Sequence, residues 1–126
     1  MDRTAVGRRG EELAAELLLA QGCRIVDRNW RYHSLGEVDL IAQHGELLLF
    51  VEVRTRRGSA RGAPEETLLP EKRARLLSLA EAYLQTHEWD GACRIDVIAL
   101  ELDTHGRLVR SRYIENAITG WDWNYR

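Results

Sequence analysis

Residues 37–54, with the sequence EVDLIAQHGELLLFVEVR, decide the fold that the rest of the chain must complete. Two segments of strand-like composition, 37–42 and 47–54, flank the polar sequence QHGE, so the stretch predicts a β-hairpin with a short glycine-containing turn. The second segment is apolar at successive positions rather than at alternate ones, which is typical of a central strand covered on both faces. The hairpin therefore predicts a sheet with a layer on each side.

The segments around this hairpin complete one sheet with helices. The pattern predicts a helix over 5–21, a strand over 23–31, a helix over 70–87 that begins at a proline, and strands over 92–102 and 107–114. The order αβββαββ around one mixed sheet predicts an α/β fold of three layers, with the central sheet flanked by helices. Because no repeat, linker or low-complexity tract interrupts the chain, we expect residues 1–126 to form a single domain.

The composition describes an ordinary globular chain. Its 126 residues are 44% hydrophobic and 30% charged, which excludes a disordered protein. We expect a cytoplasmic protein with no membrane contact, because no run of about 20 apolar residues and no signal-peptide pattern is present. Cys23 and Cys93 are far apart, which favours two buried thiols in a reducing compartment. The four histidines are scattered, so a zinc site is not expected.

Glu52 is the residue that needs explaining first. It interrupts the apolar run LLLFVEV, and an ionised carboxylate in a covered strand is costly unless a cation or hydrogen-bond donors meet it. Strand alternation places Glu52 on the same face as Phe50 and Arg54. A same-face ion pair between Glu52 and Arg54 is one explanation, and a metal site is the other.

The hairpin register decides between these explanations. With an even number of residues in the turn, Asp39 lies on the same face as Glu52, whereas an odd number would separate them. A register centred on His44–Gly45 places Glu37 opposite Glu52, with Asp39 as its diagonal neighbour at about 7–8 Å. The metal hypothesis therefore depends on an even turn.

Asp39 and Glu52 are the residue types that bind a small hard cation. Magnesium takes oxygen ligands at about 2.0–2.1 Å, and Mg²⁺ or Mn²⁺ is the expected cofactor. Glu11 is a third candidate, because it lies in line with Ala14 and Leu18 at the edge of the helix's apolar stripe. The alternatives are that Asp39 is a solvated strand residue and that Glu11 is an acid matched to the helix dipole.

Basic residues are clustered although the formal net charge is −2. Residues 54–61, RTRRGSAR, contain four arginines and no acid, and we expect a basic Gly-rich loop over 55–63. Such patches favour a polyanion as partner, although each could simply be a solvated face. The residues expected to contact a nucleic acid are Arg56, Arg57, Arg61, Lys72 and Arg73.

Three motifs together resemble a known family. They are GRRGE at 7–11, GEVDLIA at 36–42 and FVEVRTR at 50–56, with Lys72, Ala80, Tyr83 and RIDVI at 94–98 in support. Over residues 7–100 the chain resembles the YraN family, a group of predicted endonucleases in the restriction-endonuclease-like superfamily that is similar to archaeal Holliday-junction resolvases. The resemblance implies a restriction-endonuclease-like fold and metal-dependent hydrolysis of DNA, directed by branched or junction structure rather than by sequence.

The resemblance also implies roles for the site residues. Asp39 and Glu52 would bind the metal, Glu11 would be the helix acid of the site, and Arg54 takes the position of the superfamily's lysine. Arginine does not lose its proton in proteins, so Arg54 could orient water or stabilise phosphate charge but is a poor general base. Activation of water would then fall to the metal. Asp96, beside Arg94 on its own strand, is expected to be structural.

Two further expectations concern assembly and turnover. By analogy with junction resolvases, a homodimer is expected, and Trp121, Trp123 and Tyr125 could cover an apolar edge, support that dimer or stack on bases. The competing interpretation of the whole chain is a nucleic-acid-binding module that keeps the nuclease fold with little or no catalytic activity. The acids favour the enzyme, and Arg54 favours the binding module.

Overall fold

A computed structural model describes residues 2–58 and 68–118 of the chain. Its elements are α1 (Arg3–Ala20), β1 (Arg24–Arg31), the 3-10 helix η1 (His33–Leu35), β2 (Glu37–His44), β3 (Leu47–Arg57), α2 (Pro70–Thr86), β4 (Cys93–Leu102) and β5 (Leu108–Ile114). The five strands form one sheet in the order β1-β2-β3-β4-β5, in which only the β3–β4 pair is parallel. The predicted α/β fold and mixed sheet are confirmed.

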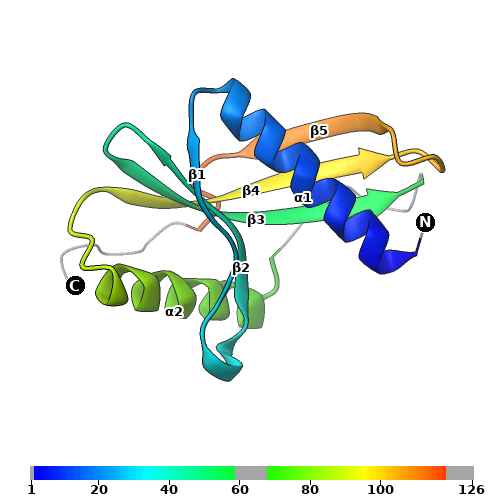
Figure 1. Cartoon of the computed structure of the whole chain (residues 1–126). Helices are drawn as coiled ribbons and strands as arrows, with labels where there is room; N and C mark the ends of the chain where they lie inside the picture. Colours follow the sequence, from blue (N-terminus) through cyan, green and yellow to red (C-terminus); the bar gives the residue numbers. More distant parts are fainter. Residues whose placement is uncertain (1, 59–67, 119–126) are drawn as a thin grey trace.

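The two helices cover opposite faces of the sheet (Figure 1). Leu49 and Val51 of β3 pack in the same buried cluster as α1, whereas Leu48 and Phe50 pack in the cluster that contains α2. Both sets of alternate positions are therefore buried, as the continuous apolar run predicted. Three layers result, with β3 at the centre.

Helix α1 begins and ends on local signals in the sequence. The Asp2 side chain accepts a hydrogen bond from the backbone N–H of Ala5 at 2.8 Å, which satisfies one of the free N–H groups of the first turn. Gly22 follows the C-cap with a φ of 92°, a left-handed conformation that costs glycine little and that stops the helix. The helix thus starts two residues before the predicted position and ends one residue before it.

The hairpin turn has two residues, which is the even turn that the metal hypothesis requires, but the register differs from the one centred on His44–Gly45. His44 pairs with Leu47, which leaves Gly45 and Glu46 in the turn. Gly45 has a φ of 61°, and glycine at the first of two turn residues is the arrangement that type II′ hairpins favour. The centre of the hairpin therefore lies one residue later than His44–Gly45. As a result Asp39, rather than Glu37, lies opposite Glu52.

Strand β3 is longer than the sequence suggested. The predicted loop over 55–63 is wrong for residues 55–57, because Thr55, Arg56 and Arg57 pair with Leu100, Glu101 and Leu102 of β4. Residues 59–63 of that loop, including Arg61, lie outside the described residues, as do Trp121, Trp123 and Tyr125.

The strands of the hairpin separate before either of them ends. Pairing between β2 and β3 stops at Leu40 and Val51. Beyond this point β2 runs to Glu37 paired with β1, and β3 runs to Arg57 paired with β4. Figure 1 shows β2 turning away from the direction of β3. The sheet is therefore forked where Asp39 and Glu52 lie.

Two smaller expectations can also be compared with the structure. Cys23 and Cys93 are buried and their thiols are free, which confirms two buried thiols. Among the described residues, neither α1 nor α2 combines the length and the apolar character that a membrane-crossing helix requires.

Candidate functional site

The fork in the sheet opens into a cleft of ≈ 580 Å³. The cleft lies between the first half of α1, the separated part of β3 and the start of α2. It is lined by Asp2, Arg3, Val6, Gly7, Glu11, Asp39, Glu52, Val53, Thr55, Arg56, Arg57 and Lys72. Acidic and basic side chains from three layers of the fold therefore meet in one depression.

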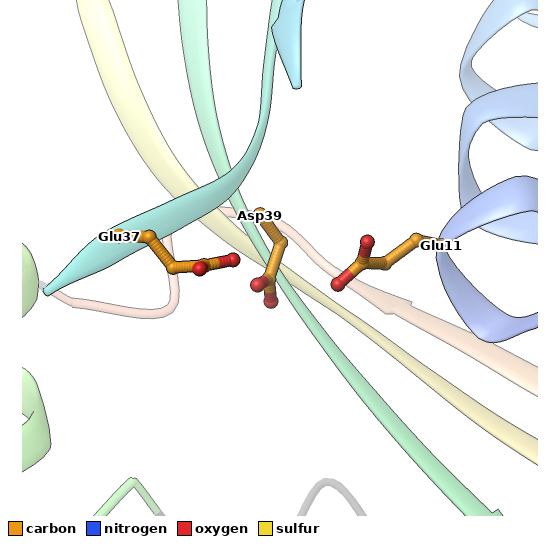
Figure 2. A group of neighbouring side chains, drawn as sticks. All are labelled: Glu11, Glu37 and Asp39. Carbon is orange, nitrogen blue, oxygen red and sulfur yellow. The ribbon is translucent and has the colours of Figure 1, made fainter. Parts of the chain in front are cut away.

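Three carboxylates converge at the floor of the fork. Glu11, Glu37 and Asp39 each offer one oxygen, and these oxygens lie within 4.8 Å of one another. Figure 2 shows the three carboxylates pointing toward a common point, Glu11 from α1 and the other two from β2. All three side chains are partly buried. The sequence analysis placed Glu37 beside the site without assigning it a role, and the structure includes it in this cluster.

Asp39 is the central acid of the site. Its carboxylate accepts a hydrogen bond from the backbone N–H of Val53 at 2.8 Å, which links the two strands beyond the end of their pairing. Burial raises the pKa of Asp39 from its ordinary value of 3.8 to about 8, and the negative charges of Glu52 and Glu11 add to the rise. The Val53 bond acts in the opposite direction. Without a bound cation, a proton therefore compensates for the missing positive charge.

Glu52 lies beside Asp39 and contacts a lysine. The hairpin register puts Asp39 and Glu52 at facing positions on one side of the sheet, as the metal hypothesis requires, and the negative charge of Glu52 raises the pKa of Asp39. Glu52 is only 7% exposed, and its Oε2 lies 3.2 Å from Nζ of Lys72 on α2. The ion-pair partner seen for Glu52 is thus Lys72, whereas the sequence analysis had considered Arg54 for this pair and had assigned Lys72 to the nucleic acid.

The catalytic role expected of Arg54 stays a prediction. Alternation puts it on the same face of β3 as Glu52, two residues along. It is not among the described residues that line the cleft, whereas Lys72 is. The ammonium that contacts Glu52 comes from Lys72 on α2.

Asn29 of β1 is a site residue that the sequence analysis missed. Its side-chain amide donates to Oε1 of Glu11 at 3.0 Å and to Oε2 of Glu37 at 2.8 Å, so one NH₂ group joins two of the three acids. Arg31 also donates to Glu37, at 2.8 Å. Asn29 has a φ of 49°, a left-handed conformation that asparagine tolerates better than most residues. An asparagine inside a strand pattern, where it is normally depleted, was the available signal.

A close contact between α1 and β3 fixes the position of Glu11. A Cβ added to Gly10 would lie 1.8 Å from Oγ1 of Thr55, so only glycine allows this approach. Because Glu11 is the next residue, the contact determines how far its carboxylate reaches over the fork. The motif residues Gly10 and Thr55 therefore act on the geometry of the acid cluster.

The other basic residues predicted to bind nucleic acid are dispersed. Arg56 lines the cleft and lies 3.7 Å from the Glu101 carboxylate. Arg57 also lines the cleft, and Arg73 is exposed on α2. The structure brings Arg56, Arg57 and Lys72 to the cleft, and contact with a nucleic acid remains a prediction for all of them.

Asp96 belongs to a separate buried network. It is 0% exposed and accepts two hydrogen bonds from Arg94, one from the Tyr113 hydroxyl at 2.6 Å and one from the Asn116 backbone N–H at 2.8 Å. The network ties β4 to β5 and to the residues that follow it. These bonds support the structural role expected of Asp96.

Comparison with known proteins identifies the family. The model of the uncharacterised protein family UPF0102 matches residues 10–100, which include Glu11, the fork and both strands of the hairpin. The chain belongs to this family. A UPF0102 protein of Symbiobacterium thermophilum is 50% identical over 113 residues, covering 89% of this chain and 94% of the relative. One from Pelotomaculum thermopropionicum is 45% identical over 116 residues, covering 91% and 96%. UPF0102 membership confirms the YraN-like resemblance seen in the motifs.

Proposed function

We propose that this UPF0102 protein is a metal-dependent endonuclease that hydrolyses phosphodiester bonds in DNA, with branched or junction DNA as the preferred substrate. The observation that carries the proposal is the convergence of the Glu11, Glu37 and Asp39 carboxylates. Glu11 and Asp39 also line, together with Glu52, a cleft that has basic side chains in its wall. A binding protein gains nothing from concentrated negative charge beside phosphate. A hydrolase that needs a divalent ion does benefit from such charge, because the carboxylates bind the ion.

The residues present fit a small hard cation. Two oxygen ligands of one magnesium ion lie at most about 4.2 Å apart, which is twice the ion–oxygen distance. The three carboxylate oxygens lie within 4.8 Å, so small side-chain rotations bring them to this spacing. Burial and the negative charges of Glu52 and Glu11 raise the pKa of Asp39, which supports a cation at this position. Mg²⁺ or Mn²⁺ is the proposed cofactor, held by Asp39, Glu11 and Glu37, with Glu52 adjacent.

Each side chain then has a definable task. Asp39 is oriented by the N–H of Val53, and Glu11 and Glu37 are held together by Asn29. Lys72 holds Glu52 in place and offers an ammonium to the substrate's phosphate. A divalent ion in this cluster supplies Lewis-acid polarisation of the phosphate and lowers the pKa of bound water.

The basic wall of the cleft positions the substrate. Arg3, Arg56 and Arg57 line the cleft beside the acids. Contacts from such residues to phosphates fix the register of a duplex without reading its sequence. This arrangement suits recognition by backbone shape, which is the basis for proposing junction or branched DNA.

The test is cleavage of labelled four-way junction, flap and linear duplex DNA in Mn²⁺ or Mg²⁺. We expect the wild type to cleave the branched substrates, and Asp39→Asn and Glu52→Gln to reduce the rate by at least 100-fold. Glu16→Gln is the matched control, because Glu16 is exposed on α1 away from the cleft. Full activity in Asp39→Asn would reject the proposed metal site.

A second candidate is the nucleic-acid-binding module. The Lys72–Glu52 ion pair favours it, because an ammonium already neutralises one acid of the cleft. Arg54 in the position of the superfamily's lysine also favours the binding module, because arginine is a poor general base. DNA binding by the wild type without cleavage in either metal would leave this second candidate.

A further inference from the structure

The face of the sheet that carries Glu52 continues beyond the cleft onto β4 and β5. Alternation along β3 puts Arg54 and Arg56 on the same face as Glu52. In the parallel register Arg54 lies beside Ala99 and Arg56 beside Glu101. Paired residues of neighbouring strands share a face, so this face extends onto β4.

Strand β5 adds two more arginines to the same face. Ala99 pairs with Arg112 and Glu101 pairs with Arg110. The resulting arrangement has two parallel rows across three strands, Arg54–Ala99–Arg112 and Arg56–Glu101–Arg110. We call the four arginines of these rows the arginine face.

The ion pairs confirm that these side chains meet. Glu101 lies 3.7 Å from Arg56 and 3.3 Å from Arg110, so one carboxylate bridges two arginines from different strands. The Arg110 side chain is 56% exposed, and Arg112 is exposed as well. Glu101 is the acid that lies within these two rows, between Arg56 and Arg110.

We propose that the arginine face binds the phosphate backbone of DNA that flanks the phosphate in the cleft. This inference rests on the proposed function for the identity of the partner. Arg56 joins the two regions, because it lines the cleft and also pairs with Glu101. Neighbouring strands lie about 4.8 Å apart, so the distance from β3 to β5 is about 10 Å, close to the axial length of about three phosphates of one strand.

The charge distribution favours a nucleic acid over an acidic peptide. The two rows repeat at a regular spacing, as phosphates do, and an exposed guanidinium group such as that of Arg110 can donate two parallel hydrogen bonds to one phosphate. The array also starts at the cleft proposed to hold the scissile phosphate. The β5 arginines thereby become part of the substrate path, although they are about 60 residues from the hairpin in sequence.

Binding can be measured without cleavage by fluorescence anisotropy in EDTA, with a labelled four-way junction and a linear duplex over a range of NaCl concentrations. We expect Arg110→Ala/Arg112→Ala to weaken binding at least ten-fold and to make the log–log salt slope shallower by about 2, one unit for each lost phosphate contact. Glu101→Gln should strengthen binding, because it removes a negative charge from the face.

Arg24→Ala is the matched control for the loss of one arginine, because Arg24 lies on the opposite edge strand, bonded to Gln43. Arg110→Lys/Arg112→Lys should keep most of the salt slope, which separates lost charge from lost folding. The proposal is overturned if the double alanine variant binds DNA no more weakly than Arg24→Ala. It is also overturned if an acidic peptide binds as tightly as DNA and depends on the same arginines.

The outcomes distinguish this proposal from the nuclease proposal. Weakened binding by the double alanine variant, with no cleavage by any form of the protein, supports the arginine face and rejects the nuclease. If cleavage depends on Asp39 but DNA binding does not depend on Arg110 and Arg112, the nuclease proposal is supported and the arginine face is rejected.

Discussion

Replacing Asp39 by asparagine should make the metal-free protein more stable. The carboxyl group is buried beside Glu52 and its pKa is raised to about 8, so keeping it in the folded protein opposes folding at neutral pH. Asparagine has nearly the same shape, and its carbonyl oxygen can still accept the N–H of Val53. Its amide can donate to Glu52. The substitution therefore removes the repulsion and keeps the bond that orients the residue.

The size of this gain in stability and its pH dependence follow from proton linkage. Between about pH 4 and pH 8 the unfolded chain has released the Asp39 proton while the folded chain retains it, so the stability of the wild type falls as the pH rises. Each unit of pKa difference corresponds to about 1.4 kcal/mol, which gives up to about 4 kcal/mol at pH 7. The stability gap between Asp39→Asn and the wild type should widen from pH 5 to pH 8 and then level off.

Urea unfolding at pH 5, 6, 7 and 8 in EDTA measures this gap. Asp103→Asn is the control, because hydrogen bonds from the Arg107 and His105 backbones lower the pKa of Asp103. That group stays ionised over the whole range, so its effect on stability should not change with pH. A gap for Asp39→Asn that stayed constant or narrowed above pH 5 would show that Asp39 is ionised and well solvated in the apo protein, and the electrostatic reasoning would fail.

Three other substitutions test separate parts of the site. Asn29→Ala and Asn29→Gly should each lower Mn²⁺ affinity about ten-fold by calorimetry, because both remove the amide that orients two acids. If backbone strain at position 29 were the cause instead, the Mn²⁺ affinities of the two variants would differ. Lys72→Met should lower the unfolding free energy by about 1–3 kcal/mol by leaving Glu52 without its cation, and millimolar Mn²⁺ should restore much of the loss in a thermal melt. Asp96→Asn should cost about 3–5 kcal/mol in urea unfolding without changing the Mn²⁺ affinity of the folded protein.

Local sequence signals were sufficient for most of the elements, and they reduced the relative placement of the two acids to one question about the turn. The continuous apolar run of β3 predicted burial on both sides, and the structure confirms it through Leu48 and Leu49, which pack against different helices. The side on which Asp39 and Glu52 lie depended only on whether the turn is even. The register itself was missed by one residue, because the polar sequence QHGE contains more than one position at which a two-residue turn can start.

The partners of the acids could not be predicted from local pattern. Lys72 meets Glu52 because α2 packs on the face of β3 that carries Glu52. Asn29 meets Glu11 because α1 packs against β1 as well as against β2 and β3. Both contacts join residues about 20 apart in sequence, and no periodicity relates them. The pattern of charges did indicate which residue types were available, and the helix packing determined which of them meet.

The divergence of β2 from β3 explains both the cleft and the unusual acidity of Asp39. If the hairpin stayed paired beyond Leu40 and Val51, the N–H of Val53 would remain within the backbone ladder, as strand groups normally do. Instead the Asp39 side chain accepts that N–H, which places a carboxylate inside the sheet's layer and beside Glu52. The same separation exposes the edge of β3 to the cleft. A chain that closed the fork would gain backbone bonds and lose the acid cluster, so the instability at Asp39 is a direct consequence of having a site at this position. Binding of a divalent ion at these acids, as proposed above, would remove that instability.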